Sequence, residues 1–303
     1  MSSFSLLILG CGSALPTISS NQSAQVLSIE NHSFLIDCGE GTQVELRRNK
    51  VKMQQIGQVF ISHLHGDHFF GLVGLLSTLH LLGRSKDLQV FGPVGLEEIV
   101  KIQLSKSGNQ LSYKIEFIEV KTANEVLFEN KRIKISSLPL KHRVPCFGFL
   151  FQEKPGLRKL KVEALKKYKI PTYARKGITE GSAFTTAEGE IIPNELISDP
   201  PHPTRSYAYC SDTAYHNTLI DSLPPVDLLY HEATFLDRDG ALAKKTGHST
   251  SKDAARVANL IGAKKLLMGH FSNRYKSTIA FEQEARQIFK ESYVAEEGKI
   301  YEL

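Results

Sequence analysis

The sequence has few cysteines and no long apolar run, and each absence excludes a class of protein. Its four cysteines are far apart and form no Cys-x-x-Cys pair, so they predict neither a disulfide framework nor a cysteine zinc site and fit a reducing cytoplasm. The longest nearly apolar stretch, residues 69–82, is shorter than the roughly 18 apolar residues that a membrane span needs. The amino terminus also lacks the basic start of a secretory signal. We therefore expect a cytoplasmic protein that does not associate with a membrane.

Length and composition indicate a folded globular protein. Hydrophobic residues make up 41% and charged residues 23% of the 303 residues, which fits neither a disordered nor a fibrous chain. Short β-branched and aliphatic runs are interspersed with helical patterns, and we find no internal repeat. This pattern predicts a single layered α/β sandwich formed by residues 1–303.

The predicted elements cover most of the chain. The predicted strands span residues 6–9, 25–29, 33–37, 58–62, 88–91, 114–119, 132–138, 207–211, 228–231 and 265–269. The predicted helices span residues 40–49, 67–82, 95–105, 251–261 and 281–290. Between residues 152 and 205 the apolar periodicity is weak and prolines and glycines recur, which predicts an excursion from the sandwich.

Positive charge is concentrated in one part of this excursion. Within residues 151–176, nine Lys and Arg residues against two Glu give a net charge of +7, whereas the whole chain carries +5. A segment of this kind is where a polyanionic partner would be expected to dock. A solvated surface insertion without a partner explains the composition equally well.

Three histidines and an aspartate lie within six residues, directly after the predicted strand 58–62: His63, His65, Asp67 and His68. Imidazole nitrogen and carboxylate oxygen are ligands that zinc and similar divalent metals accept. A lone histidine at a strand end would more often be structural. Four such side chains crowded together would repel and desolvate one another without a metal, so this run predicts a metal site.

The His-x-His-x-Asp-His spacing resembles that of the metallo-β-lactamase superfamily, which implies an αβ/βα sandwich with further ligands after later strands. Three residues follow predicted strands in this way: His142, Asp212 and His270. Each alone could equally be a helix cap, a turn residue or a structural histidine. The resemblance implies one zinc held by His63, His65, His142 and Asp212, and a second zinc held by Asp67, His68, His270 and the shared Asp212.

Seven motifs narrow the resemblance to one family within this superfamily. They occur in order at residues 35–43, 62–71, 141–143, 211–213, 231–234, 247–250 and 269–275. Together they closely resemble ribonuclease Z in its short bacterial form, a family of tRNA 3′-processing endoribonucleases. The resemblance implies that two zinc ions per subunit, or manganese or another divalent ion, activate water to remove the 3′ trailer from precursor tRNA. It also implies a homodimer.

The same resemblance implies roles for three further side chains and a second role for Asp67. His248, oriented by Glu232, would protonate the alkoxide that forms when the P–O3′ bond breaks, as a histidine beside a carboxylate can. Asp67 would act as general base as well as ligand. Arg274 would clamp a phosphate through its guanidinium. The alternatives are a surface carboxylate at Glu232, a helix-flanking residue at His248 and a solvent-facing side chain at Arg274.

The basic segment gains a role from the same resemblance. Short-form enzymes carry an arm that grips the tRNA, which implies an arm over residues 152–205 with its densest charges at Lys159, Lys161, Lys166 and Lys167. A small-molecule phosphodiesterase of the same fold is the alternative function, but a small substrate gives no reason for so basic an excursion. A non-catalytic RNA-binding module is a third reading, and the complete set of seven ligand residues opposes it.

Overall fold

The computed structural model describes residues 4–18, 20–108 and 110–303. The chain forms two compact units. The first, here called the main unit, comprises the chain up to Phe128 together with Ile135–Phe151 and Arg205–Leu303. The second, here called the arm unit, comprises Glu129–Lys134 and Gln152–Thr204.

One seven-stranded sheet of the main unit has the order β18-β1-β2-β3-β4-β5-β6. Its strands are β1 (Phe4–Gly10), β2 (Ala24–Ile29), β3 (His32–Ile36), β4 (Ile56–Phe60), β5 (Leu88–Gly92), β6 (Ile115–Glu119) and β18 (Ile300–Glu302). Strands β3 to β6 run parallel, whereas β1 and β2 pair antiparallel. Buried leucines and valines join this sheet to α1 (Thr42–Arg48), α3 (Leu72–Leu81) and α4 (Leu96–Lys106).

The second seven-stranded sheet has the order β17-β16-β15-β14-β9-β8-β7. Its strands are β7 (Val126–Glu129), β8 (Ile133–Pro139), β9 (Phe147–Glu153), β14 (Ser206–Cys210), β15 (Leu228–Glu232), β16 (Lys265–Gly269) and β17 (Ser292–Val294). Strands β14 to β17 run parallel. A second apolar core joins it to α8 (Asn217–Ser222), α10 (Ser251–Ile261) and α11 (Ile279–Arg286), while α9 (Gly240–Thr246) precedes α10.

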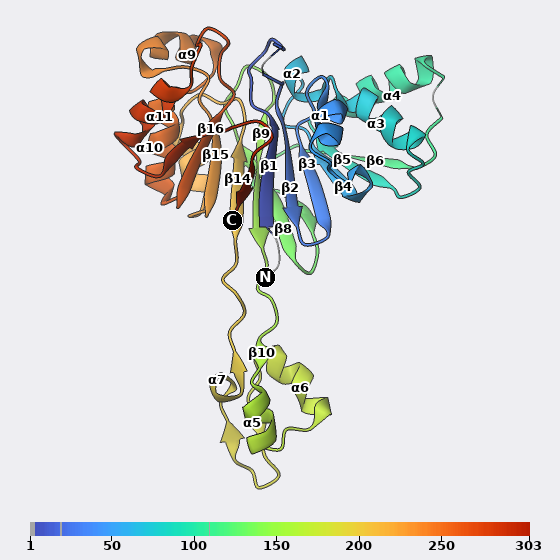
Figure 1. The fold of residues 1–303 in the computed structure, drawn as a ribbon, viewed down its shortest axis with the longest axis vertical. Helices are drawn as coiled ribbons and strands as arrows, with labels where there is room; N and C mark the ends of the chain where they lie inside the picture. The colour runs from blue at the N-terminus through green and yellow to red at the C-terminus, as the bar shows by residue number, and fades with distance from the viewer. Residues whose placement is uncertain (1–3, 19, 109) are drawn as a thin grey trace. The chain divides into compact units, whose positions relative to one another are not determined.

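Aromatic side chains fill the space between the two sheets. The ring centroids of Phe34 and Phe151 lie 5.9 Å apart, and those of Phe60 and Phe149 lie 5.3 Å apart. Because the helices lie on the outer faces of the two sheets (Figure 1), the main unit is an αβ/βα sandwich. This confirms the fold class predicted from the sequence.

The helix predicted over residues 67–82 is two helices, α2 (Gly66–Phe69) and α3. The break lies at Gly71, whose N–H donates to the Cys38 carbonyl at 2.9 Å. A Cβ at this position would overlap the Gly39 carbonyl oxygen. A close approach of two backbone segments therefore interrupts an otherwise continuous apolar pattern, and glycine permits it.

The arm unit has secondary structure and an apolar core of its own, which the sequence did not predict. Its elements are β10 (Lys159–Leu160), α5 (Val162–Lys167), α6 (Thr172–Thr179), β11 (Phe184–Thr185), β12 (Ile191–Ile192), α7 (Asn194–Ile197) and β13 (Ser198–Asp199). Its core contains Ala164, Ile170, Ile178, Ile192 and Ile197. These elements are too short to produce a recognisable hydrophobic period.

Among the described residues, no helix has both the length and the apolar character that crossing a bilayer requires.

Candidate active site

The predicted metal ligands lie beyond the carboxyl ends of strands, where ligands bind in open α/β sheets. Four follow β4 of the first sheet: His63, His65, Asp67 and His68. The other three follow β8, β14 and β16 of the second sheet: His142, Asp212 and His270. The fold thus brings together residues that are separated by more than 200 positions, such as His68 and His270.

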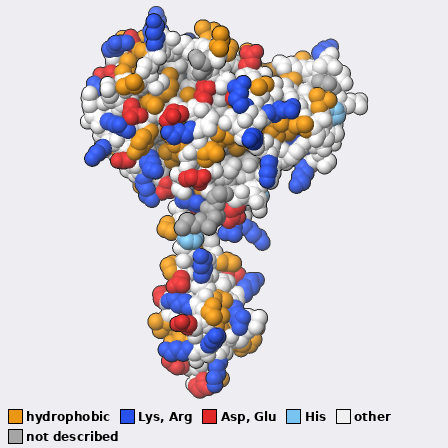
Figure 2. Space-filling model, in the orientation of Figure 1, with side chains coloured by type: hydrophobic (Ala, Val, Ile, Leu, Met, Phe, Trp, Pro, Cys, Tyr) orange, Lys and Arg blue, Asp and Glu red, His pale blue; other side chains and the backbone are white. Residues whose placement is uncertain are grey.

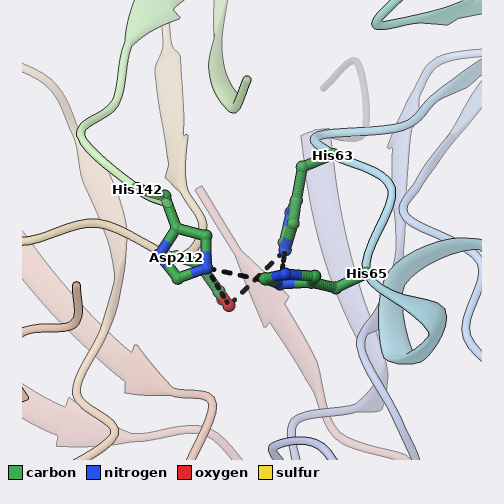
Figure 3. Close-up of side chains that lie close together, drawn as sticks. All are labelled: His63, His65, His142 and Asp212. Atoms are coloured by element: carbon green, nitrogen blue, oxygen red, sulfur yellow. Dashed lines mark hydrogen bonds and ion pairs between the residues drawn. The ribbon is translucent and has the colours of Figure 1, made fainter. Parts of the chain in front are cut away.

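The first group of side chains is His63, His65, His142 and Asp212, whose ligand atoms all lie within 4.8 Å of one another. Figure 3 shows the four side chains pointing toward one another. His65 Nδ1 lies 3.0 Å from His63 Nε2 and 3.3 Å from His142 Nε2. A tetrahedral metal with bonds of about 2.1 Å holds its ligand atoms about 3.4 Å apart. The spacing of these nitrogens therefore fits a shared metal ion.

The second group is Asp67, His68 and His270. His270 Nε2 lies 3.3 Å from both Asp67 Oδ2 and His68 Nε2. Asp212 lies between the two groups: its Oδ1 is 3.2 Å from His270 Nε2, and its Oδ2 is 3.5 Å from His63 Nε2. One oxygen of this carboxylate thus faces each group.

The protonation states of the three histidines in the first group also fit divalent metal. Burial lowers the pKa of His63 and His142, and burial together with the two neighbouring imidazoles lowers the pKa of His65 to about 4. The three imidazoles are therefore neutral at pH 7, which is their metal-binding form. Asp212 is buried, and its Oδ1 accepts no hydrogen bond from the described residues. A divalent cation would compensate this buried carboxylate.

Neighbouring groups fix the orientation of the histidines. His68 Nδ1 donates to Asp37 Oδ2 at 2.7 Å, and His142 Nδ1 donates to the Gly247 carbonyl at 2.8 Å. Asp37 is held in turn by the Ser62 N–H at 2.7 Å. Such partners set the tautomer and ring plane of a metal-binding histidine. Asp37 lies in the motif at residues 35–43, but no role for it was predicted from the sequence.

Glu232 and His248 form a buried pair beside the two groups. Glu232 is fully buried and accepts a hydrogen bond from His248 Nδ1 at 2.8 Å. The alternative interpretation of Glu232 as a surface carboxylate is therefore wrong. Burial acts to lower the pKa of His248, but the Glu232 carboxylate outweighs it and raises that pKa to about 9. His248 is therefore protonated at neutral pH.

A cavity of about 490 Å³ opens beside His248 and the two groups of side chains. Asp67, Asp212, His248 and His270 line it, and so do Phe70 and Arg143, to which the sequence analysis gave no role. The solvent exposure of the Phe70 side chain marks it as a candidate binding residue, and that exposure cannot be predicted from the sequence alone.

Arg274 and the four predicted arm lysines lie elsewhere. Arg274 is exposed, stacks over the Phe235 ring at 5.1 Å and is not among the described residues that line this cavity. Lys159, Lys166 and Lys167 are exposed on the arm unit. Lys161 belongs to the same unit and donates to the Glu195 carbonyl at 2.7 Å.

Comparison with known proteins agrees with this geometry. The family model described as Anti-Pycsar protein Apyc1 matches residues 4–157. The chain is 45% identical to Ribonuclease Z of Porphyromonas gingivalis over 100% of both chains. It is 44% identical to Ribonuclease Z of Bacteroides thetaiotaomicron, covering 98% of this chain and 95% of that one.

Among solved structures, human tRNase Z, short form (ELAC1), superposes with a TM-score of 0.72 at 28% identity, covering 98% of each chain. The full-length similarity to these relatives and the matching fold confirm the resemblance that the seven motifs predicted. The chain therefore belongs to the ribonuclease Z family, within the metallo-β-lactamase fold.

Proposed function

We propose that this protein is a zinc-dependent endoribonuclease that removes the 3′ trailer from precursor tRNA. The observation that carries this proposal is the full-length similarity to Ribonuclease Z relatives. The clustered histidines and aspartates support it, because a hydrolase of this kind needs a metal centre beneath an open cavity. The products would be a 3′-hydroxyl on the tRNA and a 5′-phosphate on the trailer.

Two zinc ions would be held by the two groups of side chains, with Asp212 shared between them. The first set is His63, His65, His142 and Asp212, and the second is Asp67, His68, His270 and Asp212. When bound, the pair supplies a nucleophilic water at neutral pH and neutralises charge on the phosphate. Manganese or another divalent ion could occupy the same oxygen and nitrogen ligands.

The side chains around the cavity would move the protons. Asp67 accepts the Ala14 N–H at 2.8 Å on Oδ2, and this contact holds the carboxylate where it can accept a proton from the attacking water. The new P–O bond forms as the P–O3′ bond breaks, and the electrons of that bond stay on O3′. His248 would donate its Nε2 proton to this oxygen while Glu232 holds Nδ1.

The arm unit would bind the body of the tRNA. It carries twelve Lys and Arg residues against eight Asp and Glu, a net charge of +4 out of +5 for the whole chain. On the face seen in Figure 2, its Lys and Arg side chains are interspersed with acidic ones. We propose that Lys159, Lys161, Lys166 and Lys167 contribute to this surface, and that Arg274 binds a phosphate closer to the cut.

We further propose that the protein acts as a homodimer in the cytoplasm. Large apolar side chains on α3 and α4 support an interface between copies: Leu81 is 81% exposed and Ile102 is 52% exposed. Four buried cysteines, all free thiols, fit a reducing compartment.

Hydrolysis of a small phosphodiester is the second candidate function. The observation that favours it is the cavity, whose volume of about 490 Å³ is typical of small-molecule sites.

Mapping the cut on one precursor tRNA tests the proposed function. We expect a single cut 3′ to the discriminator nucleotide, a 3′-hydroxyl on the tRNA and a 5′-phosphate on the trailer. Rapid hydrolysis of a cyclic nucleotide together with an uncut precursor would favour the second candidate function instead.

A further inference from the structure

We propose that Phe70 is a stacking platform for the first base of the trailer, the nucleotide on the 3′ side of the cut. The inference rests on the proposed function, because it assigns one part of the same cavity to a nucleotide of that substrate. It adds a specificity-determining residue to a site whose other side chains act on the phosphate.

The exposure of Phe70 is not explained by packing. Phe69 is 6% exposed and belongs to the apolar core between the first sheet and its helices, whereas the adjacent Phe70 is 64% exposed and lines the active-site cavity. A large aromatic side chain left open to solvent beside a catalytic centre fits a role in ligand binding better than a role in folding.

The ring of Phe70 is held in place although it is exposed. It lies against Gly66, where a Cβ would overlap the ring carbons. It also meets the Phe69 ring edge-on, with centroids 5.0 Å apart and an interplanar angle of 63°. A ring with two such supports loses little further entropy when a ligand stacks on it.

The charges around the cavity match the parts of a nucleotide. Loops of the first sheet contribute Phe70, Pro16 and Glu40, whereas loops of the second sheet contribute Arg143 and His248. The Glu40 carboxylate disfavours phosphate on the first side, and the Arg143 guanidinium favours phosphate on the second. A base is therefore best accommodated on Phe70 and Pro16, and single-stranded RNA is commonly bound by stacking of this kind.

The position of His248 indicates which base this is. The oxygen that leaves is O3′ of the discriminator nucleotide, and His248 on the second-sheet side would protonate it. The discriminator nucleoside is therefore on that side of the scissile phosphate. The trailer nucleoside, joined through O5′, extends from the phosphate in the other direction, toward the side that carries Phe70.

The test measures coupling between Phe70 and single bases of the substrate. Precursor tRNA is made with all bases, with an abasic first trailer nucleotide, or with an abasic discriminator nucleotide. The holoenzyme and its Phe70→Leu and Phe70→Tyr variants cleave each substrate, and Leu260→Ala, which removes a side chain 59% exposed on α10, is the matched control.

We expect Phe70→Leu and the abasic trailer nucleotide each to lower kcat/KM about tenfold, the size of one lost stacking contact. Combined, they should lower it no further. Phe70→Tyr keeps an aromatic ring and should still lose activity with the abasic trailer nucleotide, whereas Leu260→Ala should behave like the unchanged enzyme. Additive losses would overturn the inference, and so would coupling to the discriminator base. If the unchanged enzyme leaves the intact precursor uncut, the proposed function itself fails, and the inference fails with it.

Discussion

Glu232 determines which nitrogen of His248 is free to reach a substrate. Both oxygens of this buried carboxylate are occupied, one by His248 Nδ1 at 2.8 Å and the other by the Thr234 hydroxyl, also at 2.8 Å. Backbone N–H groups of Thr213, Thr234 and Ser249 also donate to this carboxylate, at 3.0, 2.9 and 3.1 Å. The imidazole therefore has one orientation, with Nε2 left for the cavity.

Replacing this imidazole should remove turnover and leave the metal ligands intact. We expect His248→Ala to lower kcat by about 10²- to 10⁴-fold, the contribution of a positioned general acid. Its metal content, measured by elemental analysis, should match that of the unchanged protein. His80→Ala is the control, because His80 contacts Ser112 instead of the cavity. A normal cleavage rate in His248→Ala would exclude the general-acid role.

At the residue scale, the local spacing of residues predicted the candidate metal ligands but not the groups that orient them. His63, His65, Asp67 and His68 stand within one short run, so their chemistry could be read directly from the sequence. The carbonyl that orients His142 belongs to Gly247, 105 residues further along the chain. Because the two residues are so far apart in the sequence, their contact depends on the completed fold, and no local sequence pattern predicts it.

Asp227 links the beginnings of three parallel strands of the second sheet. Its Oδ2 accepts the N–H of Ser206, the first residue of β14, at 2.8 Å. Its Oδ1 lies 2.6 Å from Nζ of Lys264, directly before β16. Burial acts to raise the pKa of Asp227, but Lys264 and Ser206 outweigh it and lower that pKa. The ionised form is therefore stabilised by folding.

This link makes a pH-dependent contribution to stability. Because the folded-state pKa is below the unfolded value, the contribution is complete above about pH 4 and is lost as the pH falls through the folded-state pKa. In metal-free protein, we expect Asp227→Asn to lower the free energy of unfolding by about 1 kcal/mol at pH 7 after allowance for solvent screening. Urea titrations of the variant and the unchanged protein at several pH values measure this difference in the free energy of unfolding.

The difference between Asp227→Asn and the unchanged protein should narrow below about pH 4. Asp221→Asn, on the exposed side of α8, is the control and should have no comparable effect. A difference that stays constant from pH 7 to pH 3 would show that the ionised carboxylate does not stabilise these strands.

At the element scale, helix-capping residues and the hydrophobic period predicted some elements correctly. The helix predicted over residues 251–261 matches α10, which begins after a capping box formed by Thr250 and Asp253. Strands β17 and β18 were missed, because each has only three residues and is defined by pairing with another strand, β16 and β1 respectively. The break at Gly71 was missed for the same reason, since its cause is contact with another segment.

The charge of the arm unit should set the salt dependence of RNA binding. Lys166→Ala combined with Lys167→Ala removes two exposed charges from α5. We expect weaker binding to every tRNA tested and a salt slope smaller by up to about two, because each phosphate contact releases about one counterion. The matched control, Lys50→Ala with Lys52→Ala, removes two exposed lysines of the main unit. An equal effect in both pairs would argue against a specific role for the arm.

At the scale of the whole molecule, the sequence predicted the sandwich and the ribonuclease Z family but not the composition of the arm unit. The sandwich was predictable because its strands are apolar and separated by clear turn signals. The arm unit also includes Glu129–Lys134, which joins Gln152–Thr204 only through tertiary contacts. The net charge of a sequence segment does not show that these two segments form one unit.

We propose that two divalent ions, held by side chains from both sheets, are required to cut RNA at the 3′ end of tRNA. Stepwise addition of zinc to metal-free protein, with the cleavage rate of a precursor tRNA measured at each step, tests it most directly. We predict no cleavage without metal and a full rate at two zinc ions per chain, always with the cut 3′ to the discriminator nucleotide. Cleavage at that position by metal-free protein would contradict the claim.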